Sequence, residues 1–91
     1  MGRRLSTSTV SRAEAVYRFL IEAGGAVTTK LLFEKLRGRG IRMEYMELYR
    51  ALRLLEKKGL VTAEAKGKET MWTLLKHVDE RELRIVLSSR G

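Results

Sequence analysis

The segment 48–61 constrains the fold more than any other, because a basic amphipathic helix there ends at a glycine and leads directly into an apolar strand. Three leucines recur at helical spacing and predict one buried stripe: Leu48, Leu52 and Leu55. Three basic residues recur at the same spacing on another face: Arg50, Arg53 and Lys57. Gly59 follows a lysine-rich last turn, which is typical of a left-handed helix cap.

Hydrophobic spacing and cap residues predict the other elements. Ser11 and Glu14 fit a capping box, so the first helix is expected to begin near residue 12. We expect helices over residues 12–23, 29–37, 42–58 and 80–88, and strands over 26–28, 60–65 and 70–75. Gly67 favours a hairpin turn between the last two strands. This order predicts an α+β domain over residues 11–75, preceded by a flexible basic arm (1–10) and followed by a C-terminal helix (76–91).

The segment 48–61 resembles the recognition helix and first wing strand of the winged-helix DNA-binding family. The matching residues are Tyr-Arg-Ala-Leu at 49–52, Leu-Glu at 55–56 and Lys-Gly-Leu-Val at 58–61. The element order over roughly residues 11–75 is also similar. The resemblance implies a winged helix-turn-helix with a three-helix core and a two- or three-stranded wing. It further implies a small prokaryotic or archaeal type of transcription regulator that occupies an operator or promoter on double-stranded DNA.

Charge and composition agree with a polyanionic partner and give no sign of catalysis. The 91 residues carry a net charge of +8, which favours nucleic acid or a membrane surface as partner. Cys is absent and His77 is the single histidine, so no metal site, cofactor or catalytic set is expected, and we predict that the protein is not an enzyme. No apolar run or signal peptide is evident, which predicts a cytoplasmic protein. Asn and Gln are absent and Asp79 is the single aspartate, a composition expected of a thermophile.

Long polar side chains on the solvent side of the third helix and on the wing are the candidate nucleic-acid contacts: Arg42, Tyr49, Arg50, Arg53, Lys57, Lys66 and Lys68. Arg3 and Arg4 are candidate contacts from the arm. Trp72 is expected to anchor the core rather than to stack on a base. The last helix has its own apolar stripe, Leu83, Val86 and Leu87, which predicts a homodimer interface; packing of this helix across the first helix of its own chain is the alternative.

One departure from the family pattern keeps two other functions open. Many members have Ser-Thr where this chain has Met46-Glu47, and Glu44 lies one turn earlier. Carboxylates repel phosphate, so the helix either enters the groove by its middle or serves another purpose. Together with Met43 and Met46, the two glutamates favour a protein-interaction module as an alternative. An RNA-binding component of a ribonucleoprotein is a further alternative.

Overall fold

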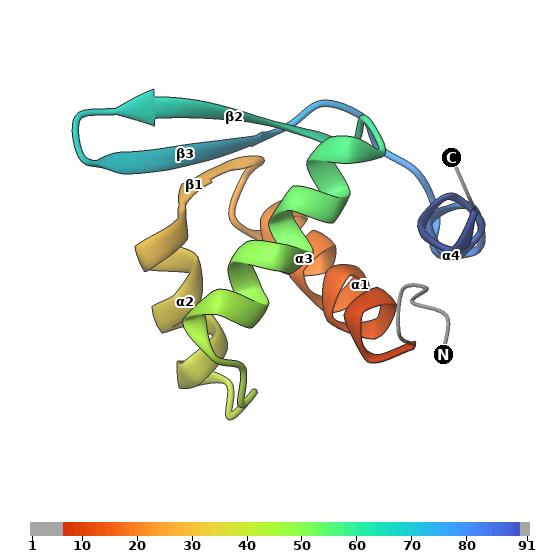
Figure 1. Ribbon diagram of the computed structural model, residues 1–91, viewed down its shortest axis with the longest axis horizontal. Coiled ribbons are helices and arrows are strands. Elements are labelled where there is room, and N and C mark those ends of the chain that lie inside the picture. Colours follow the sequence, from red (N-terminus) through yellow and green to blue (C-terminus); the bar gives the residue numbers. More distant parts are fainter. Residues whose placement is uncertain (1–6, 90–91) are drawn as a thin grey trace, which may run out of the picture.

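The computed structural model describes residues 7–89, which form four helices and three strands (Figure 1). The elements are α1 (Thr7–Glu22), β1 (Ala26–Thr28), α2 (Thr29–Gly38), α3 (Tyr45–Lys57), β2 (Val61–Lys66), β3 (Glu69–Leu74) and α4 (Glu80–Ser88). The α+β class and the predicted element order are confirmed. Within residues 7–89, no helix has the length and apolarity needed to cross a bilayer.

The strands form an antiparallel sheet in the order β1-β3-β2, and the hairpin of β2 and β3 extends past α2 (Figure 1). Trp72 lies on the central strand, opposite Val27 of β1 and Ala63 of β2. Its side chain is fully buried, and its indole N–H donates to the Thr29 hydroxyl at 2.6 Å. A buried indole N–H needs such a partner. Trp72 is therefore the core anchor that the sequence predicts, and it fixes the sheet to the start of α2.

Helix α3 follows the predicted pattern from its core stripe to its end. Leu48, Leu52 and Leu55 are fully buried, and α3 packs mainly against α1. Gly59 has a φ of +79°, which allows the Leu60 amide to donate back to the Leu55 carbonyl at 3.0 Å. This left-handed cap reverses the chain directly into β2. The buried face of α3 is thereby fixed, and so is the face that remains in solvent.

Several predicted boundaries are wrong. Helix α1 begins at least as early as Thr7, so residues 7–10 are helical rather than part of a flexible arm, and Ser11 lies inside the helix instead of capping it. Arg3 and Arg4 lie outside the described residues. Helix α3 begins at Tyr45, after the expected start at 42 or 43, and β2 and β3 are each shifted by one residue relative to the prediction.

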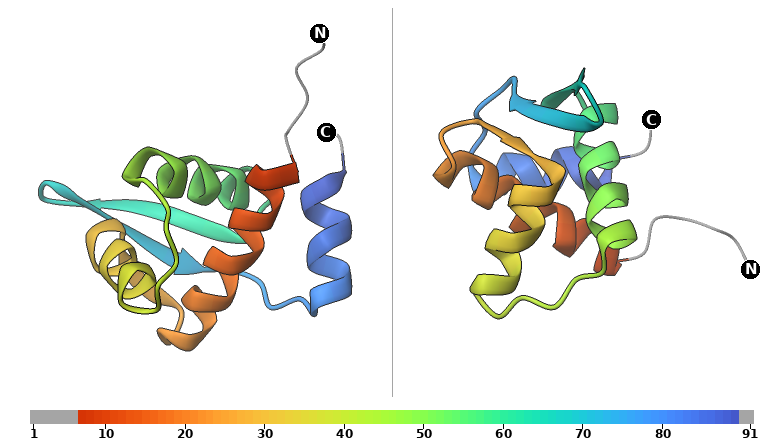
Figure 2. Two further views of the ribbon diagram at one scale, coloured as in Figure 1. Left: turned by 90° about the horizontal axis from the view of Figure 1, so that it is seen from below. Right: turned by 90° about the vertical axis from the view of Figure 1, so that its left-hand side faces the viewer.

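Helix α4 packs on α1 of its own chain, beside the helical core (Figure 2). Leu83 and Leu87 are buried there, while Val86 is partly buried against the same core. The Tyr17 hydroxyl of α1 fixes the preceding linker, because it donates to the Lys76 carbonyl and accepts from the Val78 amide. The stripe predicted to form a dimer interface therefore completes the protomer instead. Packing across the first helix of the same chain, the alternative that the sequence left open, is therefore the arrangement observed.

Candidate nucleic-acid interface

The face of α3 opposite its buried stripe forms an exposed ridge, which consists of Met46, Arg50, Arg53 and Lys57. The spacing of four, three and four residues keeps these side chains on one side of the helix. Figure 2 shows α3 at an edge of the molecule, with α1 and the sheet on its other side. A helix placed in this way can approach a partner without rearrangement of the fold.

The basic residues of the ridge differ in their internal partners. Arg53 is paired with Glu56 at 2.6 Å, and its guanidinium lies 5.6 Å from the centre of the Tyr49 ring. Arg50 and Lys57 form no ion pair with any residue from 9 to 89. Arg50 and Lys57 are therefore free to meet an external anion, whereas Arg53 must first give up or share Glu56.

Tyr49, one of the candidate contact residues, lies at the edge of the core. Its ring meets Trp72 edge-to-face with centroids 5.9 Å apart, and the residue is only partly exposed. The aromatic contact holds the Tyr49 ring in place, and the ring in turn supports Arg53. The predicted contact residue thus has a structural role as well, because it fixes an arginine of the ridge above the core.

The hairpin tip carries the predicted pair of lysines. Gly67 has a φ of +63° and provides the tight turn, while Lys66 and Lys68 on either side of it are exposed. Neither lysine is ion-paired within residues 9–89. The tip lies at the end of the hairpin that is remote from α4 (Figure 1). It provides a second group of exposed positive charges, on the hairpin of β2 and β3.

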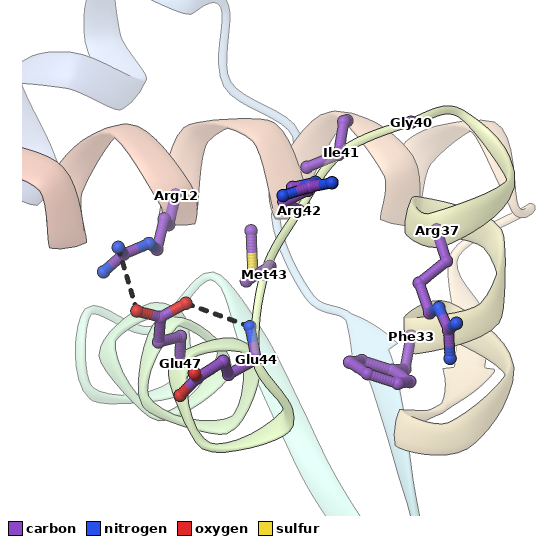
Figure 3. Close-up of a pocket in the computed structure, with 9 residues that line it drawn as sticks. All are labelled: Arg12, Phe33, Arg37, Gly40, Ile41, Arg42, Met43, Glu44 and Glu47. Atoms are coloured by element: carbon purple, nitrogen blue, oxygen red, sulfur yellow. Dashed lines mark hydrogen bonds and ion pairs between the residues drawn. The ribbon is translucent and has the colours of Figure 1, made fainter.

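Glu44 and Glu47, the two carboxylates that depart from the family pattern, cap the start of α3 (Figure 3). Glu44 and Glu47 are arranged as a capping box, in which the Glu44 amide donates to Glu47 Oε1 at 2.9 Å. Glu47 is also paired with Arg12 of α1 at 3.0 Å. Its charge is therefore engaged inside the fold instead of facing the ridge, while Glu44 remains exposed. In the sequence, the Glu-x-x-Glu spacing at 44–47, directly before the apolar stripe, is the pattern that could have predicted this cap.

A groove of about 740 Å³ adjoins this end of α3. Arg42 and Arg37 line it, so Arg42 belongs to the loop before α3 and not to the ridge. Arg37 was not among the predicted contact residues, and its guanidinium lies 5.8 Å from the centre of the Phe33 ring. Met43 also lines the groove, but its side chain is mostly buried and belongs to the core. Arg50, Arg53 and Lys57 thus share one ridge, and Arg42 lies apart from them.

A solved structure from work on the DNA recognition and protein interaction domains of HOP2, which concerned its homologous DNA pairing properties, is similar to this chain. The match has a TM-score of 0.63 and 17% sequence identity, and it covers 69% of this chain and 97% of that chain. At this identity the likeness establishes the fold alone, which is a winged helix. No protein-family model and no curated protein matches the sequence.

Proposed function

We propose that this protein binds double-stranded DNA through the ridge of α3 and the hairpin tip, and that it regulates transcription by occupying an operator or promoter. The observation that carries the proposal is the combination of an exposed basic ridge with the absence of ion pairs at Arg50 and Lys57 among residues 9–89. The likeness to a chain of HOP2, whose DNA recognition domain was studied, supports this choice of ligand.

The chemistry assigns different tasks to the basic residues. The major groove admits an α-helix, and an arginine can donate two hydrogen bonds to the edge of a guanine. Arg50 is suited to that task because it projects from the ridge and forms no ion pair with residues 9–89. Arg53, held by Glu56 and Tyr49, is suited to a phosphate. Lys66 and Lys68 are suited to the DNA backbone beside the groove, where they add affinity without reading sequence.

Salt dependence of binding to random-sequence duplex DNA tests the proposal. Each neutralised phosphate contributes a slope of about −0.9 in log K against log salt concentration, so four to six contacts predict a slope of roughly −4 to −5. Lys57→Ala should make the slope shallower by about 0.9, the contribution of one phosphate contact. Arg81→Ala is the control for loss of one positive charge, because Arg81 is also exposed but lies on α4, away from the ridge. Absence of binding at low salt, or a flat slope, would reject DNA as the ligand.

A protein-interaction module remains the second candidate, and an exposed apolar pair at the start of α3 favours it. Tyr45 is 46% exposed and Met46 is 55% exposed. Apolar side chains of this size on a surface are common in protein contacts. This candidate predicts binding to a protein partner that persists in high salt and survives Lys57→Ala. A homodimer also stays a prediction, and its interface cannot use Leu83 and Leu87 while α4 is docked on α1.

A further inference from the structure

Met46 is the one apolar member of the exposed ridge of α3, and it occupies the end at which the helix begins. Its contrast with Met43 is informative, because Met43 is 8% exposed and packs in the core, whereas Met46 is 55% exposed. Both methionines lie close in sequence to the start of α3. Packing in the core accounts for Met43 but not for the exposed side chain of Met46. One exposed apolar residue is not unusual on a protein surface. Its alignment with Arg50, Arg53 and Lys57 is the feature that calls for an explanation.

The surroundings of Met46 leave it free to meet a ligand of the ridge. Glu47, its neighbour in sequence, accepts from the Glu44 amide and from Arg12, and is thereby turned toward α1. The ring of Tyr45 packs edge-to-face on Phe33 of α2 with centroids 5.5 Å apart, on the other flank of α3. Each flanking side chain is thus held by a neighbouring helix. Met46 is exposed at the front of the ridge, with Arg50 as the next residue along it.

We infer that Met46 reads the C5 methyl group of a thymine in the major groove, an inference that rests on the proposed binding of duplex DNA. The N-terminal residues of a recognition helix are those that contact base edges. In the major groove the thymine methyl is the one apolar group that a base pair presents, and apolar side chains recognise it. A thioether side chain is flexible enough to follow the methyl group as the helix settles in the groove.

The position of Met46 relative to Arg50 also restricts the sequence that is read. Four residues of α-helix advance by about 6 Å along the axis. Base pairs are spaced by about 3.4 Å, so the thymine is expected within roughly two base steps of the guanine contacted by Arg50. The geometry therefore assigns two adjacent features of one site to two residues. Met46 selects the methyl group and Arg50 selects the guanine edge.

Replacement of thymine by deoxyuridine removes only the methyl group and gives a direct test. A preferred duplex is first selected from a random-sequence pool with the intact chain, and each thymine in it is then replaced in turn. Binding of each duplex is measured by fluorescence anisotropy for the natural protein and for its variants Met46→Ala and Met46→Leu. One of these replacements should lower the affinity of the natural protein for the duplex by about fourfold, which corresponds to about 0.8 kcal/mol for one buried methyl group. Met46→Ala should bind both duplexes equally, and Met46→Leu should keep a preference for thymine.

Ile85→Ala provides the matched control, because Ile85 is also a large exposed apolar residue, 63% exposed, but lies on α4. This variant should retain the full sensitivity to deoxyuridine. The inference is overturned if selection recovers no preferred sequence, if no replacement weakens the natural protein, or if Met46→Ala shows the same loss. In those cases duplex binding with its salt dependence still stands. Absence of all duplex binding instead rejects the proposed function, and the role of Met46 falls with it.

Discussion

Two basic regions of this protein differ in how their positive charges are paired. Where α1 packs against α3 and α4, the arginines are paired with carboxylates of other elements: Arg12 with Glu47, Arg18 with Glu80 and Arg84 with Glu14. On the ridge of α3, Arg50 and Lys57 have no such partner among residues 9–89. Both regions contribute to the same net charge of +8. Only the second leaves its charge available for a ligand.

The difference shows that net charge by itself does not locate a binding surface. A paired surface arginine contributes little attraction at a distance, since its field is largely cancelled by the neighbouring carboxylate. An unpaired one attracts phosphate and releases counterions when it binds. The absence of ion pairs with residues 9–89 therefore distinguishes Arg50 and Lys57 from the arginines that join helices. Removal of the packing under the paired region, and then of single charges from each region, tests this difference.

The largest expected effect is on stability, from Leu87→Ala in the α4 region. Leu87 is fully buried in the core that α4 shares with α1. Truncation of a buried leucine leaves a cavity and costs about 2–5 kcal/mol. Denaturant unfolding followed by circular dichroism measures this loss. Affinity for duplex DNA, measured where the variant is still folded, should stay unchanged because the ridge does not involve α4.

Sedimentation of the same variant tests the role of α4 in assembly. If Leu87→Ala converts a dimer into a folded monomer of unchanged unfolding free energy, α4 joins two chains and its position on α1 is not the one that matters. If the unfolding free energy falls without a change in mass, the packing of α4 within the chain is supported. Val86→Ala is a milder companion, because Val86 is only partly buried.

The second effect is on DNA binding, from Arg50→Ala on the ridge. Loss of an arginine that contacts a guanine edge should cost about 1–3 kcal/mol on a preferred duplex and should relax sequence preference. Lys68→Ala should weaken preferred and random duplexes alike, as expected for a backbone contact. Stability should change by no more than about 0.5 kcal/mol for either variant, because both side chains are exposed. Equal losses on both duplexes for Arg50→Ala would mean that the ridge binds backbone only.

The sequence predicts the ridge well because its information is local. The leucine stripe, the basic face and Gly59 lie within one short segment, and helical period alone assigns Leu48 and Arg50 to opposite faces. The cap at Glu44 is local as well, but it uses glutamate where the common pattern has Ser, Thr, Asp or Asn. Because this cap was not predicted, the expected start of α3 lies too early in the chain.

The paired region is harder to predict because its contacts join distant parts of the chain. Ser11 and Glu14 have the spacing of a capping box, yet Ser11 lies inside α1 and Glu14 is paired with Arg84 of α4. The stripe of α4 likewise shows that a partner is needed, but it does not decide between α1 and a second copy of the chain. Local pattern thus predicts which face of a helix is apolar. The surface that covers this face depends on how the whole chain folds.

The smallest expected effect comes from the paired region itself, from Arg84→Ala. Arg84 Nε donates to Glu14 Oε2 at 3.2 Å, and the Arg84 side chain is 71% exposed. An exposed pair of this kind contributes about 0.2–1 kcal/mol to stability. A double-mutant cycle with Glu14→Gln isolates the pairwise free energy from the effects of each single change. Affinity for duplex DNA and its salt slope should be the same as for the natural sequence, because the charge removed is compensated within the fold. A shallower salt slope for Arg84→Ala would mean that this arginine meets phosphate despite its partner, and pairing would no longer distinguish the two regions.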